Sequence, residues 1–170
     1  DIPDVQREPI PAAVCSPSTV VPIDRVRVIG ERINPTGKKL MKEALRRGFD
    51  DFLLVGVSGG RLDHTLVNVY LLVMLREQGK RALLVDDYAE MELIGSEPAE
   101  ISDKYPFYSL VNITGTARGI TETGCKFPLD NGEIRCDYQY GTSNEVLPGQ
   151  IAVVSVKEGL LLLIKDFPEV

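Results

Sequence analysis

The sequence has no apolar run long enough to span a bilayer, and no basic segment followed by a short apolar stretch opens it. It also has no excess of basic residues, since 19 Lys and Arg stand against 25 Asp and Glu for a net charge of −6. Binding to a nucleic-acid backbone depends on basic side chains that displace counterions. These absences predict a cytoplasmic protein that contacts neither a membrane nor nucleic acid.

Cysteine and histidine are scarce. The three cysteines, Cys15, Cys125 and Cys136, are odd in number and lack the paired spacing of a zinc site. We expect reduced thiols, although Cys125 and Cys136 can also face each other across a hairpin. The chain shows no Ser/His/Asp triad pattern, no GxxxxGK[ST] loop and no GxGxxG. The common signatures of nucleophilic catalysis and of phosphate binding are therefore missing.

What the sequence does contain changes in three steps. Residues 1–25 carry five prolines, which remove backbone donors and predict an extended segment. Residues 26–88 alternate short apolar runs with helical periodicity and predict a β-α-β-α-β unit. Residues 89–170 carry short strand patterns separated by turn sequences. The predicted fold class is α/β followed by all-β, with a small parallel βαβαβ layer and an antiparallel β-sandwich.

The elements follow from these patterns. In the first half we expect strands at 26–31, 52–57 and 81–87, and helices at 37–48 and 64–80. In the second half the strand candidates are 90–94, 107–114, 119–124, 133–140, 151–156 and 160–166. Asn131 and Gly132 predict a hairpin turn between strands, and residues 142–145 predict a loop.

The only histidine lies in residues 59–64, "GGRLDH", between an apolar strand and a helix. This junction belongs to the carboxyl edge of the parallel sheet, where open α/β sheets bind ligands. Asp63 is placed to cap the helix N-terminus, and Arg61 to present a cation at the same mouth. The alternative is purely structural: Asp63 only caps the helix and Arg61 only pairs with a neighbour.

Four motifs resemble the C-terminal part of thiamine pyrophosphokinase over about residues 48–166: "GGRLDHTLVNVYLL", "KFPLDN", "GTSNEV" and "VSVKEGLLLLI". The resemblance implies an α/β domain followed by a β-sandwich, and a homodimer that holds thiamine between its subunits. It implies pyrophosphoryl transfer from ATP to thiamine, with Mg²⁺ accompanying ATP. It also implies that Arg61, Asp63, Ser143 and Asn144 bind substrate, and that Asp63 is catalytic.

The match is incomplete at its acidic motifs. That family carries an upstream Gly-Asp-x-Asp-Ser motif and a Thr-Asp pair, and neither occurs here. The remaining candidates for metal ligands are Asp63 and Asp86, since Asp87 would point to the opposite face of a continuing strand. Phosphoryl-type transfer depends on metal and charge positioning. We therefore expect weak or no turnover.

Residues 21–48 resemble a different family, the start of the methyltetrahydrofolate-binding barrel of cobalamin-dependent methionine synthase, and the Pro-rich residues before them resemble the linker to that barrel. Only about one βα unit of that barrel is present, too little for a folate site. Residues 1–47 thus predict a fusion, natural or constructed, or else a divergent kinase. The alternative function is a folded chimeric homodimer that binds thiamine or nothing, without catalysis. The predicted dimer contact uses residues 151–156 and 160–164.

Overall fold

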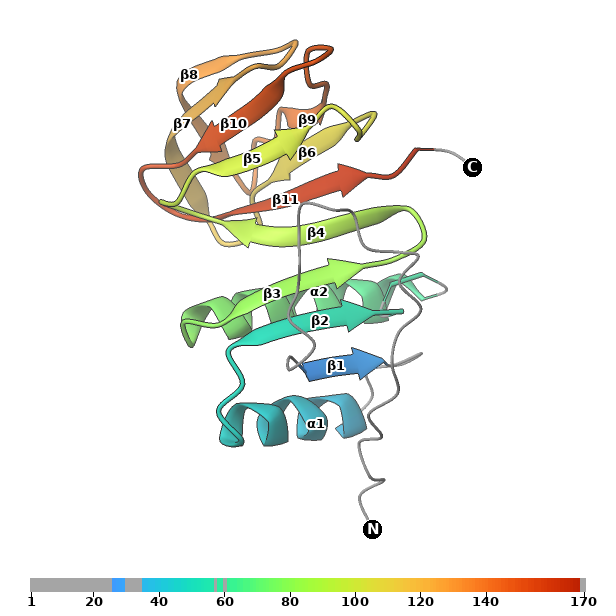
Figure 1. The fold of residues 1–170 in the computed structure, drawn as a ribbon. Helices are drawn as coiled ribbons and strands as arrows, with labels where there is room; N and C mark the ends of the chain where they lie inside the picture. The colour runs from blue at the N-terminus through green and yellow to red at the C-terminus, as the bar shows by residue number, and fades with distance from the viewer. Residues whose placement is uncertain (1–25, 30–34, 57, 60, 169–170) are drawn as a thin grey trace.

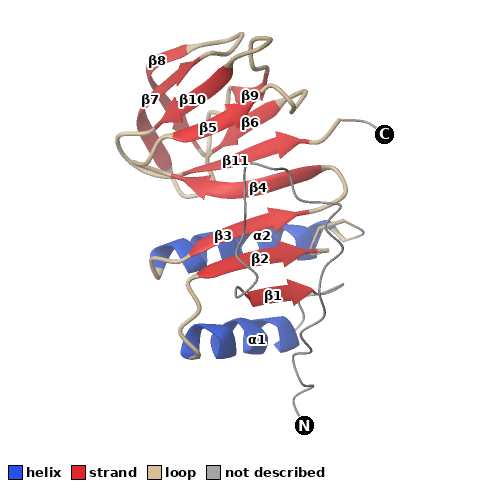
Figure 2. Ribbon diagram, viewed as in Figure 1, coloured by secondary structure: helices blue, strands red, loops and turns tan. Residues whose placement is uncertain are grey.

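The computed structural model describes residues 26–29, 35–56, 58–59 and 61–168, with side chains from Met41 onward. The predicted Pro-rich segment at residues 1–25, with Cys15, lies outside the described residues. Within them, no helix is long and apolar enough to cross a membrane. Two sheets and two helices make up the fold of these described residues (Figures 1 and 2).

The larger sheet is mixed and has seven strands. Their spatial order is β1 (Val26–Ile29), β2 (Asp51–Val55), β3 (Arg81–Val85), β4 (Ala89–Ile94), β11 (Leu161–Asp166), β6 (Tyr108–Val111) and β9 (Gly141–Asn144). Strands β1, β2 and β3 pair in parallel, and the remaining neighbours pair antiparallel. The second sheet is antiparallel in the order β5 (Ala99–Ser102), β10 (Ile151–Ser155), β7 (Thr116–Thr123) and β8 (Leu129–Arg135).

Helices α1 (Pro35–Arg46) and α2 (Leu62–Glu77) connect the three parallel strands. Helix α1 begins two residues earlier than predicted because proline suits the first helical position, where no backbone donor is needed. It is followed by Gly48 at φ +81°, a backbone conformation that favours glycine. Helix α2 packs against the sheet through Leu72 and Leu75, which share a core with Leu54 of β2.

The core of the β-rich half lies between the two sheets (Figure 2). Side chains from both sheets, including Ile101, Leu110 and Ile134, are completely buried there. Val154 and Leu163 are also 0% exposed, and both belong to strands predicted to face a second copy of the chain. That predicted contact surface is wrong for most of its residues, because Ala152, Val154, Val156 and residues 161–163 are already buried within the chain, whereas Ile151 is 56% exposed.

Three local predictions are also wrong. Asn131 and Gly132 form no hairpin turn but lie inside β8, where Asn131 has φ +54° and the pairing with β7 is interrupted by register shifts. Residues 141–144 form strand β9 instead of a loop. Strand β8 ends at Arg135, so the predicted strand at 133–140 stops early. Cys125 and Cys136, by contrast, are free thiols, in agreement with the expectation of reduced thiols.

The larger sheet continues across residue 88, because β3 pairs directly with β4. Strand β11 then joins β4 to β6, so the parallel and antiparallel parts are one sheet. The division of the chain into parts at residues 1–25, 26–88 and 89–170 stays a prediction.

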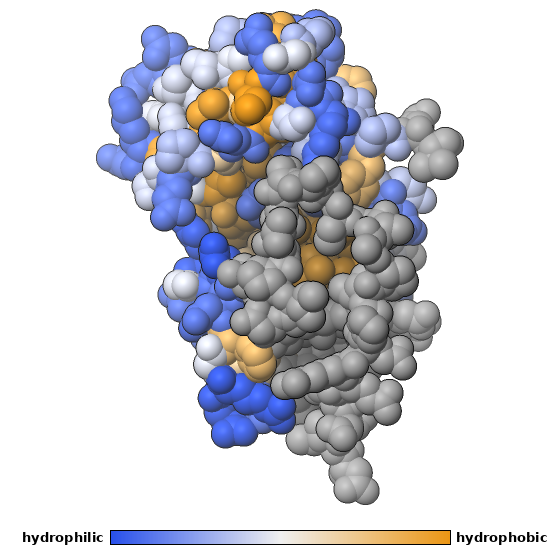
Figure 3. All heavy atoms as spheres, in the orientation of Figure 1, coloured by the Kyte–Doolittle hydropathy of each residue, from blue (hydrophilic) through white to orange (hydrophobic). Residues whose placement is uncertain are grey.

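Figure 3 shows apolar side chains gathered on the viewed face of the β-rich half, bordered by hydrophilic ones.

Strand β1 covers the edge of β2 through residues Val26 to Ile29. Deleting residues 1–36 is therefore expected to give insoluble protein, since an uncovered apolar strand edge promotes aggregation. Deleting residues 1–25 keeps β1 and serves as the matched control. Soluble yield and cooperative unfolding by circular dichroism measure the difference, and a soluble, cooperatively folding 37–170 chain would contradict the role of β1.

Candidate functional site

The junction between β2 and α2 is held by backbone contacts around Thr65. The N–H of Gly59 donates to Thr65 Oγ1 at 3.1 Å, and the N–H of Thr65 donates to the carbonyl oxygen of Arg61 at 3.1 Å. Arg61 is the extended residue before the helix, and the helix starts at Leu62. The predicted capping role of Asp63 is therefore wrong, because Asp63 lies within the first helical turn.

Arg61 and Asp63 form an exposed ion pair. Arg61 Nε donates to Asp63 Oδ1 at 3.0 Å, and Arg61 Nη2 donates to the other carboxylate oxygen. The hydrogen bond from Arg61 lowers the pKa of Asp63 below its ordinary value, so this carboxylate is ionised at neutral pH. Its negative charge near the N-terminus of α2 is favourable for the helix dipole. Asp63 thus presents a solvated anion in the single chain.

Asp86 lies in the turn after β3 and is already occupied by protein donors. Its Oδ1 accepts the N–H groups of Tyr88 and Ala89, both at 2.8 Å, and its Oδ2 accepts the hydroxyl of Ser58. The last bond connects the loop after β2 to the turn after β3. The prediction that β3 continues through Asp86 is wrong, since the strand ends at Val85 and Asp86 closes the turn itself.

Magnesium requires several oxygen ligands in near-octahedral geometry. Within the described ranges, no group of three or more His, Cys, Asp or Glu side chains is placed to hold a metal. Asp63 is paired with Arg61, and Asp86 accepts three hydrogen bonds. This donor set does not fit a preformed magnesium site, and the assignment of Asp63 and Asp86 as metal ligands stays a prediction.

Asn144 is 5% exposed and uses every hydrogen-bonding position of its side-chain amide. Its Nδ2 donates to Glu122 Oε2 at 3.1 Å and to the carbonyl oxygen of Phe127 at 3.0 Å. Its Oδ1 accepts the N–H of Phe127 at 3.1 Å and that of Glu145 at 2.9 Å. The amide therefore has no position left for a ligand, and its role is to hold the backbone around it.

Ser143 precedes Asn144 and faces the other way. It is exposed, and its backbone has φ +59°, a left-handed conformation that is uncommon for serine. Its N–H donates to the Oγ of Ser109 at 3.0 Å. The special backbone presents the Ser143 hydroxyl at the surface beside the buried amide.

The "KFP" and "TSNE" segments form one unit. The N–H of Lys126 donates to the carbonyl oxygen of Glu145 at 2.9 Å, and the N–H of Leu147 donates to that of Gly124 at 3.0 Å. Lys126 Nζ also pairs with Glu145 Oε1 at 2.7 Å. Phe127 has both backbone groups bound by Asn144, and its side chain is 59% exposed. Sequence reasoning missed Phe127, although its position in a resembling motif was a usable signal.

The two halves of the candidate site lie along the side of the larger sheet at which β2 and β3 end. The strand register aligns one row of residues across it: Val55, Val85, Glu90, Lys165, Tyr108 and Asn144. Strand β9 is five strand-to-strand steps from β2, which corresponds to about 24 Å at roughly 4.8 Å per step. One small heterocycle cannot span that distance within a single chain.

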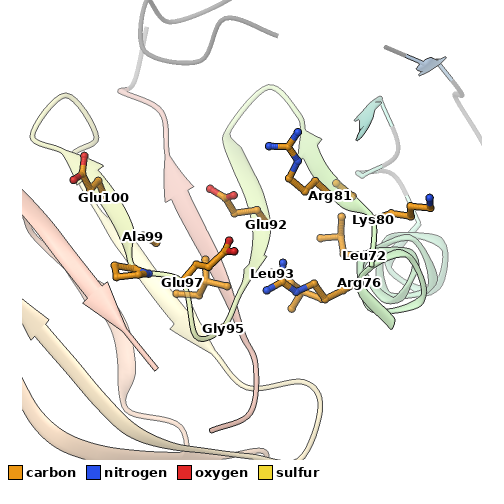
Figure 4. A pocket seen from close by; sticks show the side chains of 13 residues that line it. Leu72, Arg76, Lys80, Arg81, Glu92, Leu93, Gly95, Glu97, Ala99 and Glu100 are labelled. Atoms are coloured by element: carbon orange, nitrogen blue, oxygen red, sulfur yellow. The ribbon is translucent and has the colours of Figure 1, made fainter. Parts of the chain in front are cut away.

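A separate cavity of about 260 Å³ lies at the opposite edge, where α2 ends and β3 begins (Figure 4). It contains none of the predicted site residues. Its charged side chains include Lys80, Arg81 and Glu92. These three already form ion pairs with Asp50, Asp51 and Lys165, respectively. Three of its six charged lining residues are therefore held in ion pairs.

Comparison with known proteins gives the class of the β-rich half. Residues 98–161 match the family model described as thiamin pyrophosphokinase, vitamin B1 binding domain. Those residues run from just before β5 to the first residue of β11 and include Glu122, Phe127, Ser143 and Asn144.

The particular relatives are thiamine pyrophosphokinases. The curated enzyme of Bacillus subtilis (strain 168) is 27% identical over 125 residues, which cover 72% of this chain and 58% of that protein. The crystal structure of thiamine pyrophosphokinase from Bacillus subtilis superimposes with a TM-score of 0.72 at 24% identity, covering 79% of this chain and 63% of that one. The enzyme from Geobacillus thermodenitrificans gives a TM-score of 0.68 at 25% identity, covering 82% and 65%.

This chain is thiamine pyrophosphokinase-like in its fold and in the matched segment. It spans about six-tenths of the length of the relatives above, at 58% and 63% for those from Bacillus subtilis. Each of the two structures covers more than three quarters of this chain. The activity of the full-length relatives is therefore a proposal for this chain.

Replacing Asn144 with alanine is expected to lower the free energy of unfolding by about 2–4 kcal/mol, because buried groups bound by the amide lose their partner. Urea unfolding followed by circular dichroism measures the change. Ser143→Ala is the matched control at the adjacent exposed position, with a change of about 0.5 kcal/mol or less. Equal midpoints for the two variants would show that the amide does not hold the unit together.

Proposed function

We propose that this chain binds thiamine at a site shared between two copies, with Arg61 and Asp63 from one copy and Ser143 from the other. One observation carries the proposal: the two half-sites share a sheet edge but lie five strand steps apart within a chain. The match of residues 98–161 to a vitamin B1 binding domain supports thiamine as the ligand. Asn144 holds the second half-site from inside.

The exposed groups suit a cationic heterocycle. Asp63 is ionised and exposed, so it can form a charge-assisted contact, roughly twice as strong as a neutral one. Phe127 presents an exposed aromatic ring whose face attracts cations, and in the single chain Lys126 Nζ lies over it, 5.6 Å from the centroid. The Ser143 hydroxyl both donates and accepts hydrogen bonds. The Arg61 guanidinium, released from Asp63 on binding, is then free to meet an anionic group.

Exposed apolar side chains beside Asp63 support a second copy. Along the first half of α2, Leu62 is 72% exposed, Leu66 53%, Val67 48% and Tyr70 54%. Contiguous exposed apolar surface of this kind is typical of interaction sites. We propose that a second copy covers this stripe and brings its Ser143 half-site to Asp63. The homodimer and the cytoplasmic location stay predictions.

The proposed reaction class, which the resemblance to thiamine pyrophosphokinase implies, is transfer of a pyrophosphoryl group from ATP to the hydroxyethyl oxygen of thiamine, with AMP as the leaving group. The relatives above carry the name thiamine pyrophosphokinase. In this chain, Asp63 and Ser143 orient thiamine, and any magnesium arrives with ATP. We propose weak turnover, because transfer of this kind depends on charge stabilisation that the described carboxylates do not assemble. The fusion of residues 1–47 from a methionine synthase-like segment also stays a prediction.

Asp63→Asn is expected to weaken thiamine binding about tenfold, since it removes a charge-assisted contact. Isothermal calorimetry measures the affinity, and circular dichroism checks that the fold is unchanged. Ser143→Ala is expected to weaken binding through the other half-site. Wild-type protein that releases no heat at millimolar thiamine would refute the proposed ligand.

Mixing the two variants tests whether the site is shared. A mixed dimer of the Asp63→Asn and Ser143→Ala chains contains one intact site, built from Asp63 of one chain and Ser143 of the other. After random exchange of subunits, about a quarter of all sites should regain wild-type affinity. If the site lies within one chain, mixing restores nothing.

Turnover is expected to be slower by orders of magnitude than in an enzyme with a complete set of metal ligands. Formation of thiamine diphosphate from thiamine, ATP and magnesium is the measurement, with Asp63→Ala as the control. Fast turnover that Asp63→Ala abolishes would contradict weak catalysis. It would mean that other residues of the chain supply the missing charge stabilisation.

A further inference from the structure

A buried carboxyl group lies beneath the Ser143 half-site. Glu122 of β7 is 2% exposed, and its Oε2 accepts the hydroxyl of Tyr108 at 2.7 Å and the Asn144 amide at 3.1 Å. Leu129 and Val154, its partners on the neighbouring strands β8 and β10, have no titratable side chain. The Tyr108 hydroxyl also interacts with the Cys125 side chain. No lysine or arginine forms an ion pair with Glu122 among the described residues.

Burial raises the pKa of Glu122 above its ordinary value, against the smaller opposing effect of its two hydrogen bonds. Glu90 is a useful contrast. It accepts the Tyr105 hydroxyl, also at 2.7 Å, but it faces Lys165 Nζ at 2.6 Å. Burial is the largest effect on the pKa of Glu90 and raises it, but the hydrogen bonds from Lys165 and Tyr105 together with the charges of Lys165 and Lys104 outweigh burial, and the net pKa is lowered. Glu122 differs from Glu90 because no lysine or arginine among the described residues pairs with its carboxyl group.

Glu122 contributes to the orientation of the Asn144 amide. In the observed orientation, the amide nitrogen faces two acceptors, Glu122 Oε2 and the carbonyl oxygen of Phe127. The amide oxygen faces two N–H groups, those of Phe127 and Glu145. A reversed amide would place oxygen against oxygen and nitrogen against N–H groups. Glu122 therefore supplies one of the four contacts that fix a single orientation.

We propose that Glu122 is a positioning residue of the ligand site: its carboxyl group orients the Asn144 amide, which in turn holds the backbone of Phe127 and the position of Ser143. Glu122 does not touch the ligand. It acts through one side chain on two exposed groups that come from segments 16 residues apart. This inference rests on the proposed thiamine site, and it adds a residue that the site contacts do not include.

The raised pKa gives the inference a signature in stability. At pH values below the unfolded value of about 4.5, Glu122 is protonated whether the chain is folded or unfolded. As the pH rises from there towards the higher folded pKa, the unfolded chain releases its proton more easily, and stability is lost. Glutamine keeps an acceptor oxygen and does not titrate. The stability of Glu122→Gln relative to wild type should therefore increase as the pH rises above about 4.5.

Three variants of the full chain test the proposal: Glu122→Gln, Glu122→Met and, as matched control, Glu90→Gln. Calorimetry with thiamine and urea unfolding are carried out from pH 5 to pH 8. We expect Glu122→Gln to keep wild-type affinity within about twofold, and Glu122→Met, which lacks an acceptor, to weaken binding about tenfold. Glu90→Gln should leave binding unchanged but lose stability at neutral pH, because the buried Lys165 then keeps only Glu92 as an ion-pair partner.

The side-chain amide signals of Asn144 in a ¹H–¹⁵N spectrum report the positioning step without any ligand. They should stay in place in Glu122→Gln and shift or broaden in Glu122→Met.

If wild type binds no thiamine, the proposed thiamine site is wrong, and the amide signals and the pH dependence of stability still decide the role of Glu122. Thiamine binding by folded Glu122→Met as tight as by Glu122→Gln overturns the proposal. So does a Glu122→Gln stability difference that is the same at pH 5 and pH 8. If Glu122→Met does not fold, the Glu122→Gln comparison alone decides.

Discussion

The pairing of β11 with β4 on one side and with β6 on the other makes one sheet from the two halves of the chain. Its side chains serve both cores: Leu161 and Leu163 lie in the core between the sheets, and Leu162 lies in the core beneath α2. This explains why residues 160–164 are continuously apolar instead of alternating, since both faces of the strand are covered. It also keeps the Asp63 and Ser143 half-sites at one edge and at a set separation.

The two half-sites are held by different kinds of interaction. Arg61 and Asp63 are solvated, and their ion pair is open to exchange with a ligand or with salt. Ser143 is held instead by a buried network in which Asn144 and Glu122 satisfy one another in a low-dielectric interior. The Asp63 half-site therefore offers a ligand a charged group, and the Ser143 half-site offers it a backbone conformation that is already fixed. A ligand that meets both gains an electrostatic contact without having to order the second surface.

Sequence periodicity predicted the order of the helices and most strands, because each depends on apolar residues that recur at the spacing of its own buried face. It failed where distant partners decide the structure. Asn131 and Gly132 usually form a turn, but the bulged pairing with β7 keeps them in a strand. The predicted helix cap at Asp63 was wrong because the helix begins two residues earlier than expected. Asn144 was predicted to be a site residue from its motif, but its inward orientation depends on contacts with residues distant in sequence, among them Glu122, which is 22 residues away.

Strand β9 is the outermost strand beyond β6, and it is only four residues long. Ser143 near its end has a left-handed backbone, and its pairing with β6 is irregular between Tyr108 and Leu110. Such an edge lacks the regular row of N–H and C=O groups that another strand needs for pairing. A copy of the chain that approaches here cannot extend the sheet, so it must dock through side chains. The irregular backbone thus excludes fibre-like growth at the surface that presents Ser143.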